Sequence, residues 1–109
     1  MENLKNKVAL ITGGTKGIGQ GVAEALLELG MNVAITSRTL TAAEKAAAEL
    51  NKSGKGKAIG IKADVRSIDS QMSAVNQVIA EWGQLDVLIA NAGIGHFANV
   101  ADLTVGQWQ

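Results

Sequence analysis

A glycine-rich segment containing one lysine lies near the start of the sequence. It reads Gly13-Gly14-Thr15-Lys16-Gly17-Ile18-Gly19, so that Gly13, Gly17 and Gly19 have the spacing G-x-x-x-G-x-G. It follows a short apolar run and opens an amphipathic stretch. Glycines at a strand-to-helix turn let a phosphate reach the backbone N–H groups, and Gly19 allows the helix to pack closely on the strand. A loop of this kind is also common as structure alone. The candidate ligand-binding residues of this segment are Gly13, Thr15, Lys16, Gly17, Ile18 and Gly19.

Side chains of the usual catalytic types are scarce. The sequence has no cysteine, no tyrosine and a single histidine, His96. One imidazole is too few for a zinc centre built on histidines, so we expect no metal site. His96 follows Gly95 in a predicted loop with no carboxylate close in sequence, which favours a solvated histidine over an acid or base. We therefore expect no acid or base catalysis by His96.

The composition limits the classes of partner. The 109 residues suffice for one domain at most, and 47% apolar with 18% charged residues is typical of a globular protein. Ten basic and ten acidic residues cancel without forming a run of like charge, which argues against binding to nucleic acid or to an anionic membrane. With no signal peptide or membrane-spanning segment in the pattern, we expect a cytoplasmic protein that binds a small molecule.

Short apolar runs alternate with amphipathic stretches along the chain. Apolar, partly β-branched runs predict buried strands, and apolar residues at three- and four-residue steps predict helices. Trp82 and Met72 are interpreted as core residues rather than ligand contacts because they have helical spacing among Ile and Val. The expected strands are Val8–Thr12, Asn32–Thr36, Ala58–Ile61 and Leu85–Ala90; the expected helices are Gly17–Leu29, Thr41–Leu50 and a third opened by Ser67 and closed by Gly83.

The helix ends and faces follow from the same pattern. Gly30 is suited to the position after the first helix, and Thr41 with Glu44 has the spacing of a capping box. The predicted apolar faces are Ile18, Val22, Ala25, Leu26 and Leu29 in the first helix, and Ile68, Met72, Val75, Ile79 and Trp82 in the third.

The strict alternation of strands and helices predicts an α/β fold of the doubly wound, Rossmann type. Right-handed crossovers then give a parallel sheet with helices on both faces and strand order 3-2-1-4. We expect half of such a domain, residues 1–109 being the amino-terminal portion of a single NAD(P)-binding domain. The fourth strand, Leu85–Ala90, should then present an unpaired edge.

These motifs together resemble the short-chain dehydrogenase/reductase family over nearly the whole chain. The segment Thr12 to Gly19 is similar to the family's cofactor loop, Asp64-Val65 to its adenine contact, and Asn91-Ala92-Gly93 to its Asn-Ala-Gly turn. Leu103-Thr104 with Trp108 resembles the start of the family's long interface helix. Extended-family epimerases and reductases space their glycines differently.

The resemblance implies a role for each matched residue. Asp64 would accept a hydrogen bond from the adenine amino group and Val65 would donate its backbone N–H. Asn91 would be mainly structural, tying the central strand to Thr12, while Ala92 and Gly93 would lie along the adenosine ribose. Without the resemblance, Asp64 reads as a loop carboxylate that caps a helix.

The residues after the second strand favour NADP over NAD as cofactor. NAD-binding members of such folds place a carboxylate there, which binds the ribose hydroxyls and would repel a 2′-phosphate. Here Ser37 occupies that position and Arg38 follows, with Lys16 as a second cation, and a guanidinium suits phosphate oxygens. The alternative is that Arg38 and Lys16 are solvated surface charges.

The resemblance also implies chemistry that this sequence does not contain. The family transfers hydride between nicotinamide and a carbonyl or alcohol, using a Tyr-x-x-x-Lys segment, a Ser and an Asn that we expect beyond Gln109. We therefore expect an NADP-dependent oxidoreductase, homo-oligomeric at full length, of which this chain is the cofactor-binding half. The alternative is a half-domain that binds a dinucleotide without catalysis.

Overall fold

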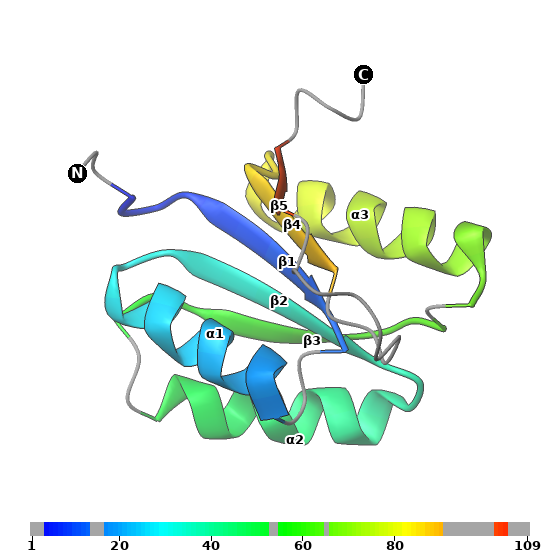
Figure 1. The fold of residues 1–109 in the computed structure, drawn as a ribbon, viewed down its shortest axis with the longest axis horizontal. Coiled ribbons are helices and arrows are strands. Elements are labelled where there is room, and N and C mark those ends of the chain that lie inside the picture. The colour runs from blue at the N-terminus through cyan, green and yellow to red at the C-terminus, as the bar shows by residue number, and fades with distance from the viewer. Residues whose placement is uncertain (1–3, 14–16, 53–54, 65, 91–101, 105–109) are drawn as a thin grey trace.

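The computed structural model describes residues 4–13, 17–52, 55–64, 66–90 and 102–104 as strands, helices and the turns between them (Figure 1). The helices are α1 (Gly17–Glu28), α2 (Leu40–Asn51) and α3 (Ile68–Trp82). The strands are β1 (Val8–Thr12), β2 (Asn32–Ser37), β3 (Ala58–Lys62), β4 (Val87–Ala90) and β5 (Asp102–Thr104).

The strands form one sheet in the order β3-β2-β1-β4-β5. The first four are parallel, with Ile11 opposite Ile35 on one side of β1 and opposite Ile89 on the other. Helices α1 and α2 cover one face of the sheet and α3 covers the other (Figure 1). The predicted doubly wound α/β fold with strand order 3-2-1-4 is therefore confirmed.

The edge of β4 differs from the prediction. Leu103 and Thr104 were expected to begin a helix, but they lie in β5, which pairs antiparallel with β4 and places Leu88 opposite Leu103. An open strand edge carries N–H and C=O groups that need partners, and β5 supplies them. The expectations of a helix at Leu103 and of an unpaired β4 edge are both wrong. Trp108 lies outside the described residues.

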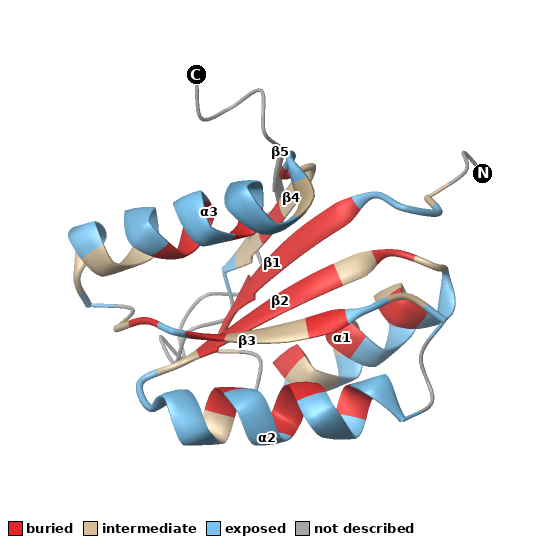
Figure 2. Cartoon of the chain, turned by 180° about the vertical axis from the view of Figure 1, so that it is seen from behind, coloured by how far each residue is buried: buried red, intermediate tan, exposed pale blue. Residues whose placement is uncertain are grey.

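The central strand β1 is buried along its whole length because helices cover both of its faces (Figure 2). Its side chains alternate between the two layers, as side chains in a strand do. Val8 and Leu10 pack toward α3, in one cluster with Val78. Ile11 packs toward α1 and α2, in a second cluster with Leu27.

The face of α2 that packs on the sheet consists largely of alanine, at Ala43, Ala46 and Ala47. These small side chains let the helix backbone approach β3 closely. A Cβ atom added at Gly60 would lie 2.3 Å from the carbonyl oxygen of Ala43. Glycine is therefore required at this position of β3 by the close approach of the two backbones.

The buried faces of α1 and α3 are rotated from the predicted ones. Ile18 is 71% exposed and Ile68 is 77% exposed, and Leu29, Met72 and Ile79 are exposed too. Smaller residues face the sheet instead, so the prediction that Met72 is a core residue is wrong. Trp82, Val22 and Leu26 are partly buried against the core. The residues that are fully buried in these two helices are Gly19, Ala23, Leu27, Ala74, Val75 and Val78.

The helix ends agree with the sequence except at α2. Ser67 caps α3 by accepting a hydrogen bond from the backbone N–H of Ser70, and Gly83 ends it with a φ of 76°. Gly30 follows α1 with a φ of 87°. The cap of α2 is Thr39 rather than the predicted Thr41, because the chain turns into the helix two residues earlier and the Thr39 hydroxyl accepts from Ala42 N–H.

Candidate functional site

The carboxyl ends of β1, β2 and β3 lie side by side at one edge of the sheet, since these strands are parallel and in register. Ser37, the last residue of β2, is opposite Lys62, the last residue of β3. The chain leaves these strands through Gly13, Arg38 and Asp64. In doubly wound sheets, ligands bind in the crevice outside the carboxyl ends of the strands. This edge, referred to below as the carboxyl edge, is the candidate site.

The glycines that begin and end the loop after β1 adopt backbone conformations that favour glycine. Gly13 has a φ of 70° and Gly17, the first residue of α1, a φ of 64°. The backbone N–H of Gly13 donates to the side-chain oxygen of Thr36 over 3.0 Å, which fixes the start of the loop against β2. Thr36 is fully buried.

The amino end of α1 lies at the carboxyl edge and favours an anion. The first N–H groups of a helix have no partner within the helix, and the helix dipole adds a partial positive charge. The first turn of α1 contains no acidic side chain. Ile18 is exposed there, whereas Gly19 is buried against the sheet.

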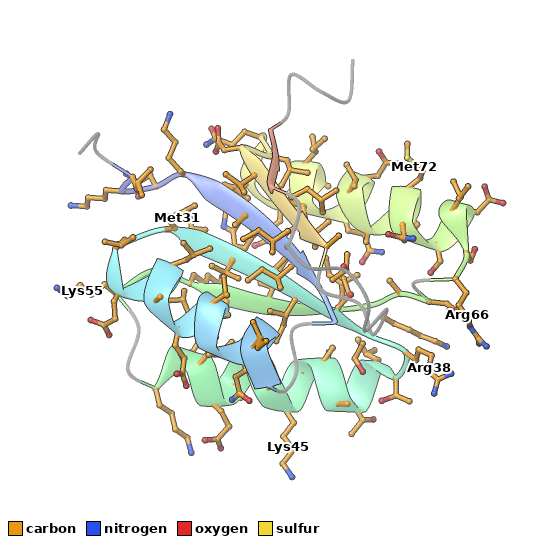
Figure 3. All side chains as sticks on the ribbon, in the orientation of Figure 1. Met31, Arg38, Lys45, Lys55, Arg66 and Met72 are labelled. Atoms are coloured by element: carbon orange, nitrogen blue, oxygen red, sulfur yellow. The ribbon has the colours of Figure 1, made fainter. Side chains whose placement is uncertain are left out.

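Ser37 and Arg38 extend the carboxyl edge beyond β2. The Ser37 carbonyl oxygen accepts a hydrogen bond from Ala63 N–H over 2.8 Å, which joins the ends of β2 and β3. Ser37 is half-buried and Arg38 is exposed. Figure 3 labels Arg38 and Arg66 at neighbouring positions, where the chain leaves β2 and β3. The residue that ends β2 and the one after it therefore supply a hydroxyl and a cation, and neither of them is a carboxylate.

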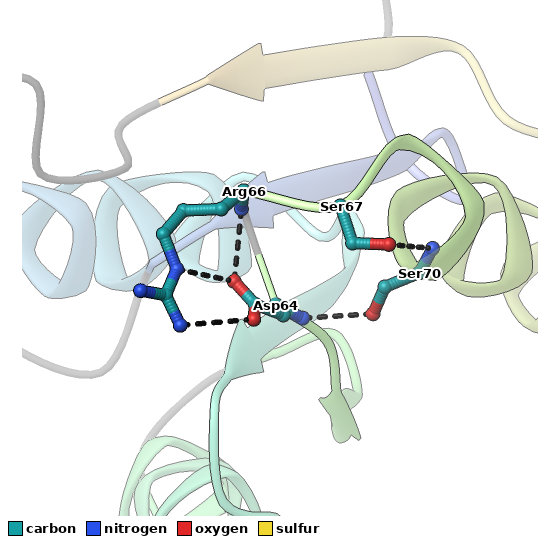
Figure 4. Close-up of polar contacts among 4 residues, drawn as sticks. All are labelled: Asp64, Arg66, Ser67 and Ser70. Carbon is teal, nitrogen blue, oxygen red and sulfur yellow. Dashed lines mark hydrogen bonds and ion pairs between the residues drawn. The ribbon is translucent and has the colours of Figure 1, made fainter.

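Asp64 is held by an extensive set of hydrogen bonds (Figure 4). Its Oδ1 accepts from the backbone N–H of Arg66 at 2.9 Å and from Arg66 Nε at 3.2 Å. Its Oδ2 accepts from Arg66 Nη2 at 3.2 Å. Its own backbone N–H donates to Ser70 Oγ over 2.8 Å. The guanidinium of Arg66 thus donates to both carboxylate oxygens, and Ser70 in the first turn of α3 fixes the main chain of Asp64.

These contacts lower the pKa of Asp64. The largest cause is the hydrogen bonding by the Arg66 side chain, followed by that of the Arg66 backbone N–H, and the positive charge of Arg38 contributes as well. The same pairing raises the pKa of Arg66. Asp64 is therefore a carboxylate across the physiological range and an acceptor of hydrogen bonds.

The structure brings seven of the predicted site residues to the carboxyl edge: Gly13, Gly17, Ile18, Gly19, Ser37, Arg38 and Asp64. The other predicted site residues, and His96, lie outside the described residues. They are Thr15, Lys16, Val65, Asn91, Ala92 and Gly93.

Three residues that support this edge were not singled out from the sequence. Thr36 is identifiable only through its burial at the end of β2, where a polar side chain needs a partner. Arg66 lies two residues after Asp64, and Ser70 lies in the first turn of α3. The separation of two residues between Asp64 and Arg66 is a signal for a local turn, because an aspartate often accepts from the N–H two residues on.

A hollow lies at the opposite edge of the sheet, where the strands begin. Its volume is about 570 Å³, and Lys5, Lys55, Lys57 and Glu28 contribute to its lining. The carboxyl end of α1 lies there: Leu27 oxygen accepts from the N–H groups of Gly30, Lys55 and Gly56. Lysines around a helix carboxyl end complement the helix dipole, so this hollow does not compete with the carboxyl edge as the candidate site.

The part of the chain that the structure describes has neither a group of metal ligands nor a membrane-spanning helix. No three His, Asp or Glu side chains come together there as metal ligands, and the chain has no cysteine. None of the described helices has the length and hydropathy needed to cross a bilayer.

The sequence profile of the short chain dehydrogenase family matches residues 7–109. Among curated relatives, versicolorin reductase 1 of Dothistroma septosporum is 40% identical over 102 residues. That match covers 93% of this chain and 38% of the relative, so this chain spans about two fifths of the relative's length.

Solved structures of similar sequence share the fold. The RhlG/NADP active-site complex of Pseudomonas aeruginosa superposes with a TM-score of 0.72 at 37% identity, covering 84% of this chain and 36% of that one. The NADPH-dependent 3-quinuclidinone reductase of Rhodotorula rubra gives a TM-score of 0.74 at 37% identity, covering 80% and 33%.

Proposed function

Because this chain belongs to the short chain dehydrogenase family, we propose that it is the cofactor-binding part of an NADP-dependent oxidoreductase. In this proposal, residues 1–109 form the amino-terminal portion of a single NAD(P)-binding domain. The reaction is hydride transfer between the nicotinamide and a carbonyl or alcohol substrate, and the nicotinamide supplies the hydride chemistry. The role of this chain's residues is to bind and orient the dinucleotide.

The observation that carries the proposal is the composition of the carboxyl edge. Gly13 and Gly17 both have positive φ and flank the loop that leads to the acid-free amino end of α1. This arrangement fits a pyrophosphate, which needs close approach to backbone N–H groups. We assign the intervening Thr15 and Lys16, together with Ile18 and Gly19, to the same phosphate site.

The choice of NADP rests on the end of β2. A 2′-phosphate carries close to two negative charges and would be repelled by a carboxylate beside the ribose. This chain has Ser37 at that position and Arg38 next to it. Among the solved structures of similar sequence, one is described as an NADP complex and another as an NADPH-dependent reductase, which supports the same choice.

The adenine end of the cofactor is assigned to Asp64 and Val65. Asp64 carries a carboxylate that can accept a hydrogen bond from the adenine amino group, and the N–H of Val65 is assigned to the ring. Asn91, Ala92 and Gly93, after β4, are assigned to the adenosine side of the site. These assignments follow the family's motifs, and the lowered pKa of Asp64 supports its role as acceptor.

Titration of the protein with NADP and NAD, followed by calorimetry, tests the proposal. We expect NADP to bind at least about tenfold more tightly, since a charge-assisted contact contributes that much or more. Equal affinities would contradict the choice of NADP. Gly17→Val should abolish binding of both cofactors because valine is strained at a φ of 64°, while circular dichroism should show the helices retained. Undiminished binding by that variant would contradict the phosphate site.

A further inference from the structure

Among the described residues, Arg66 makes the most hydrogen bonds to the Asp64 carboxylate of the proposed adenine site. We propose that Arg66 is a positioning residue for adenine recognition, which holds the Asp64 carboxylate so that one oxygen faces the adenine amino group. This inference rests on the proposed function and extends it to the selection of the base.

The geometry leaves room for a ligand on the carboxylate. A carboxylate has about four lone-pair sites. Among the described residues, Oδ1 of Asp64 accepts from two groups of Arg66 and Oδ2 accepts only from Arg66 Nη2. Oδ2 therefore retains a site for one further donor, and an adenine amino group can bind without displacing Arg66.

The side chain of Arg66 limits the rotation of the Asp64 carboxylate. The main chain of Asp64 is fixed by its hydrogen bond to Ser70 Oγ, and by the turn that its Oδ1 makes with Arg66 N–H. The Asp64 side chain is nevertheless 39% exposed, so that the carboxylate could rotate. The planar guanidinium donates to both carboxylate oxygens of Asp64 and so fixes the plane of the carboxylate. The ion pair is exposed, with 72% of the Arg66 side chain accessible, so its contribution to stability is small and its effect lies in orientation.

The orientation has a consequence for base selection. Adenine presents an amino donor at C6, whereas hypoxanthine presents a carbonyl oxygen at the same place. A fixed carboxylate attracts the donor and repels the carbonyl, because two acceptors then face each other. The ratio of affinities for adenine and hypoxanthine cofactors is thus a direct readout of how well Asp64 is held.

The test uses NADP, NAD and the hypoxanthine analogues of both, titrated into the wild-type protein and Arg66→Met. Methionine keeps an unbranched stem and removes every donor of the guanidinium, while the backbone N–H remains. We expect Arg66→Met to bind both adenine cofactors about tenfold more weakly and to bind both analogues with an affinity equal to or higher than that of the wild type. The affinity of Arg66→Lys for the adenine cofactors should lie between those of the wild type and Arg66→Met, because an ammonium keeps the positive charge but lacks the planar set of donors of a guanidinium.

The matched control is Lys52→Met. Lys52, the residue after α2, makes an exposed ion pair to Glu49 at 3.1 Å, at the end of the helix opposite to the carboxyl edge. This variant should bind all four cofactors as the wild type does. Thermal unfolding of both methionine variants verifies that each is folded before titration.

Each other outcome overturns the inference. An equal loss for all four cofactors would make Arg66 a general structural residue, and a loss confined to the two 2′-phosphorylated cofactors would make it a phosphate ligand. Unchanged selectivity in Arg66→Met, with a wild type that binds NADP, would overturn this inference alone. Failure of the wild type to bind any dinucleotide would overturn the proposed function as well.

Discussion

The backbone N–H of Gly13 donates a hydrogen bond to the hydroxyl oxygen of Thr36 over 3.0 Å. The bond joins the first residue after β1 to a fully buried side chain of β2. The conformation of the glycine loop is therefore set in part by the neighbouring strand, and a change at Thr36 should be felt at the proposed phosphate site.

Thr36→Val removes this acceptor with little change of volume. We expect the free energy of unfolding to fall by about 1–2 kcal/mol, because the Gly13 N–H loses its partner, and the affinity for NADP to decrease. Chemical denaturation and calorimetric titration measure the two effects. Thr36→Ser keeps the hydroxyl and should retain the affinity. An affinity in Thr36→Val equal to that of the wild type would show that the bond does not position the loop.

Gly60→Ala tests the close approach of α2 to β3. The added methyl group would meet the Ala43 carbonyl at 2.3 Å, and relief requires a shift of backbone. We expect a loss of about 1–3 kcal/mol in the free energy of unfolding. Gly21→Ala is the matched control: it lies in α1 with no neighbour within 4 Å of the added atom and should stabilise by about 0.5–1 kcal/mol. Similar effects of the two substitutions would contradict the packing described here.

Ser37→Asp should reverse the preference between cofactors. A carboxylate beside the ribose can accept from its hydroxyls and repels a 2′-phosphate, so we expect NAD to bind more tightly than NADP in this variant. Competitive titration of the two cofactors measures the ratio. Ser37→Asn has nearly the same shape without the charge and should leave NADP preferred. A preference for NAD in Ser37→Asn would mean that size, and not charge, selects the cofactor.

The ion pair of Asp64 and Arg66 predicts that the stability of the folded protein depends on pH in the acid range. The pKa of Asp64 in the folded protein is lowered, so the stabilisation is present above the ordinary aspartate pKa of about 3.9 and is lost as the pH falls through the lower folded value. In Arg66→Met the pKa of Asp64 should rise toward the ordinary value, which carbon-detected NMR of the carboxyl group would follow. An unchanged titration would exclude the Arg66 side chain as the main cause.

The sequence predicts the fold class, the strand order and the loop after β1, since these depend on apolar runs and glycines that need no tertiary information. It does not predict which side of α1 faces the sheet. Ile18 and Leu29 suggested one stripe, but the buried stripe of α1 is Gly19, Ala23 and Leu27, two of which are small residues that suit close packing on the strands. Helical periodicity gives the spacing of a buried stripe, whereas its phase depends on the surface against which the helix packs.

The candidate site shows a similar division. Ser37 ends β2, and Arg38 and Asp64 lie just after strands. Because parallel pairing brings strand ends together, the proximity of these three residues is predictable. The contacts of Thr36 and Arg66 depend on where side chains turn after the strands end. The sequence did not predict β5, because its three residues form a strand by pairing with the distant β4.

The contact between Val8 and Asp86 has a consequence for the order in which the protein folds. Val8 N–H donates to Asp86 Oδ2 over 2.8 Å, and Asp86 N–H donates to the Val8 carbonyl oxygen, across 78 positions of sequence. One helix separates β1 from β2 in the sequence, whereas three helices and two strands separate β1 from β4. Pairings between distant segments form slowly because a long loop must close first. During synthesis, β2 is therefore available to pair with β1 early, and the other edge of β1 has no pairing with β4 until β4 has emerged from the ribosome.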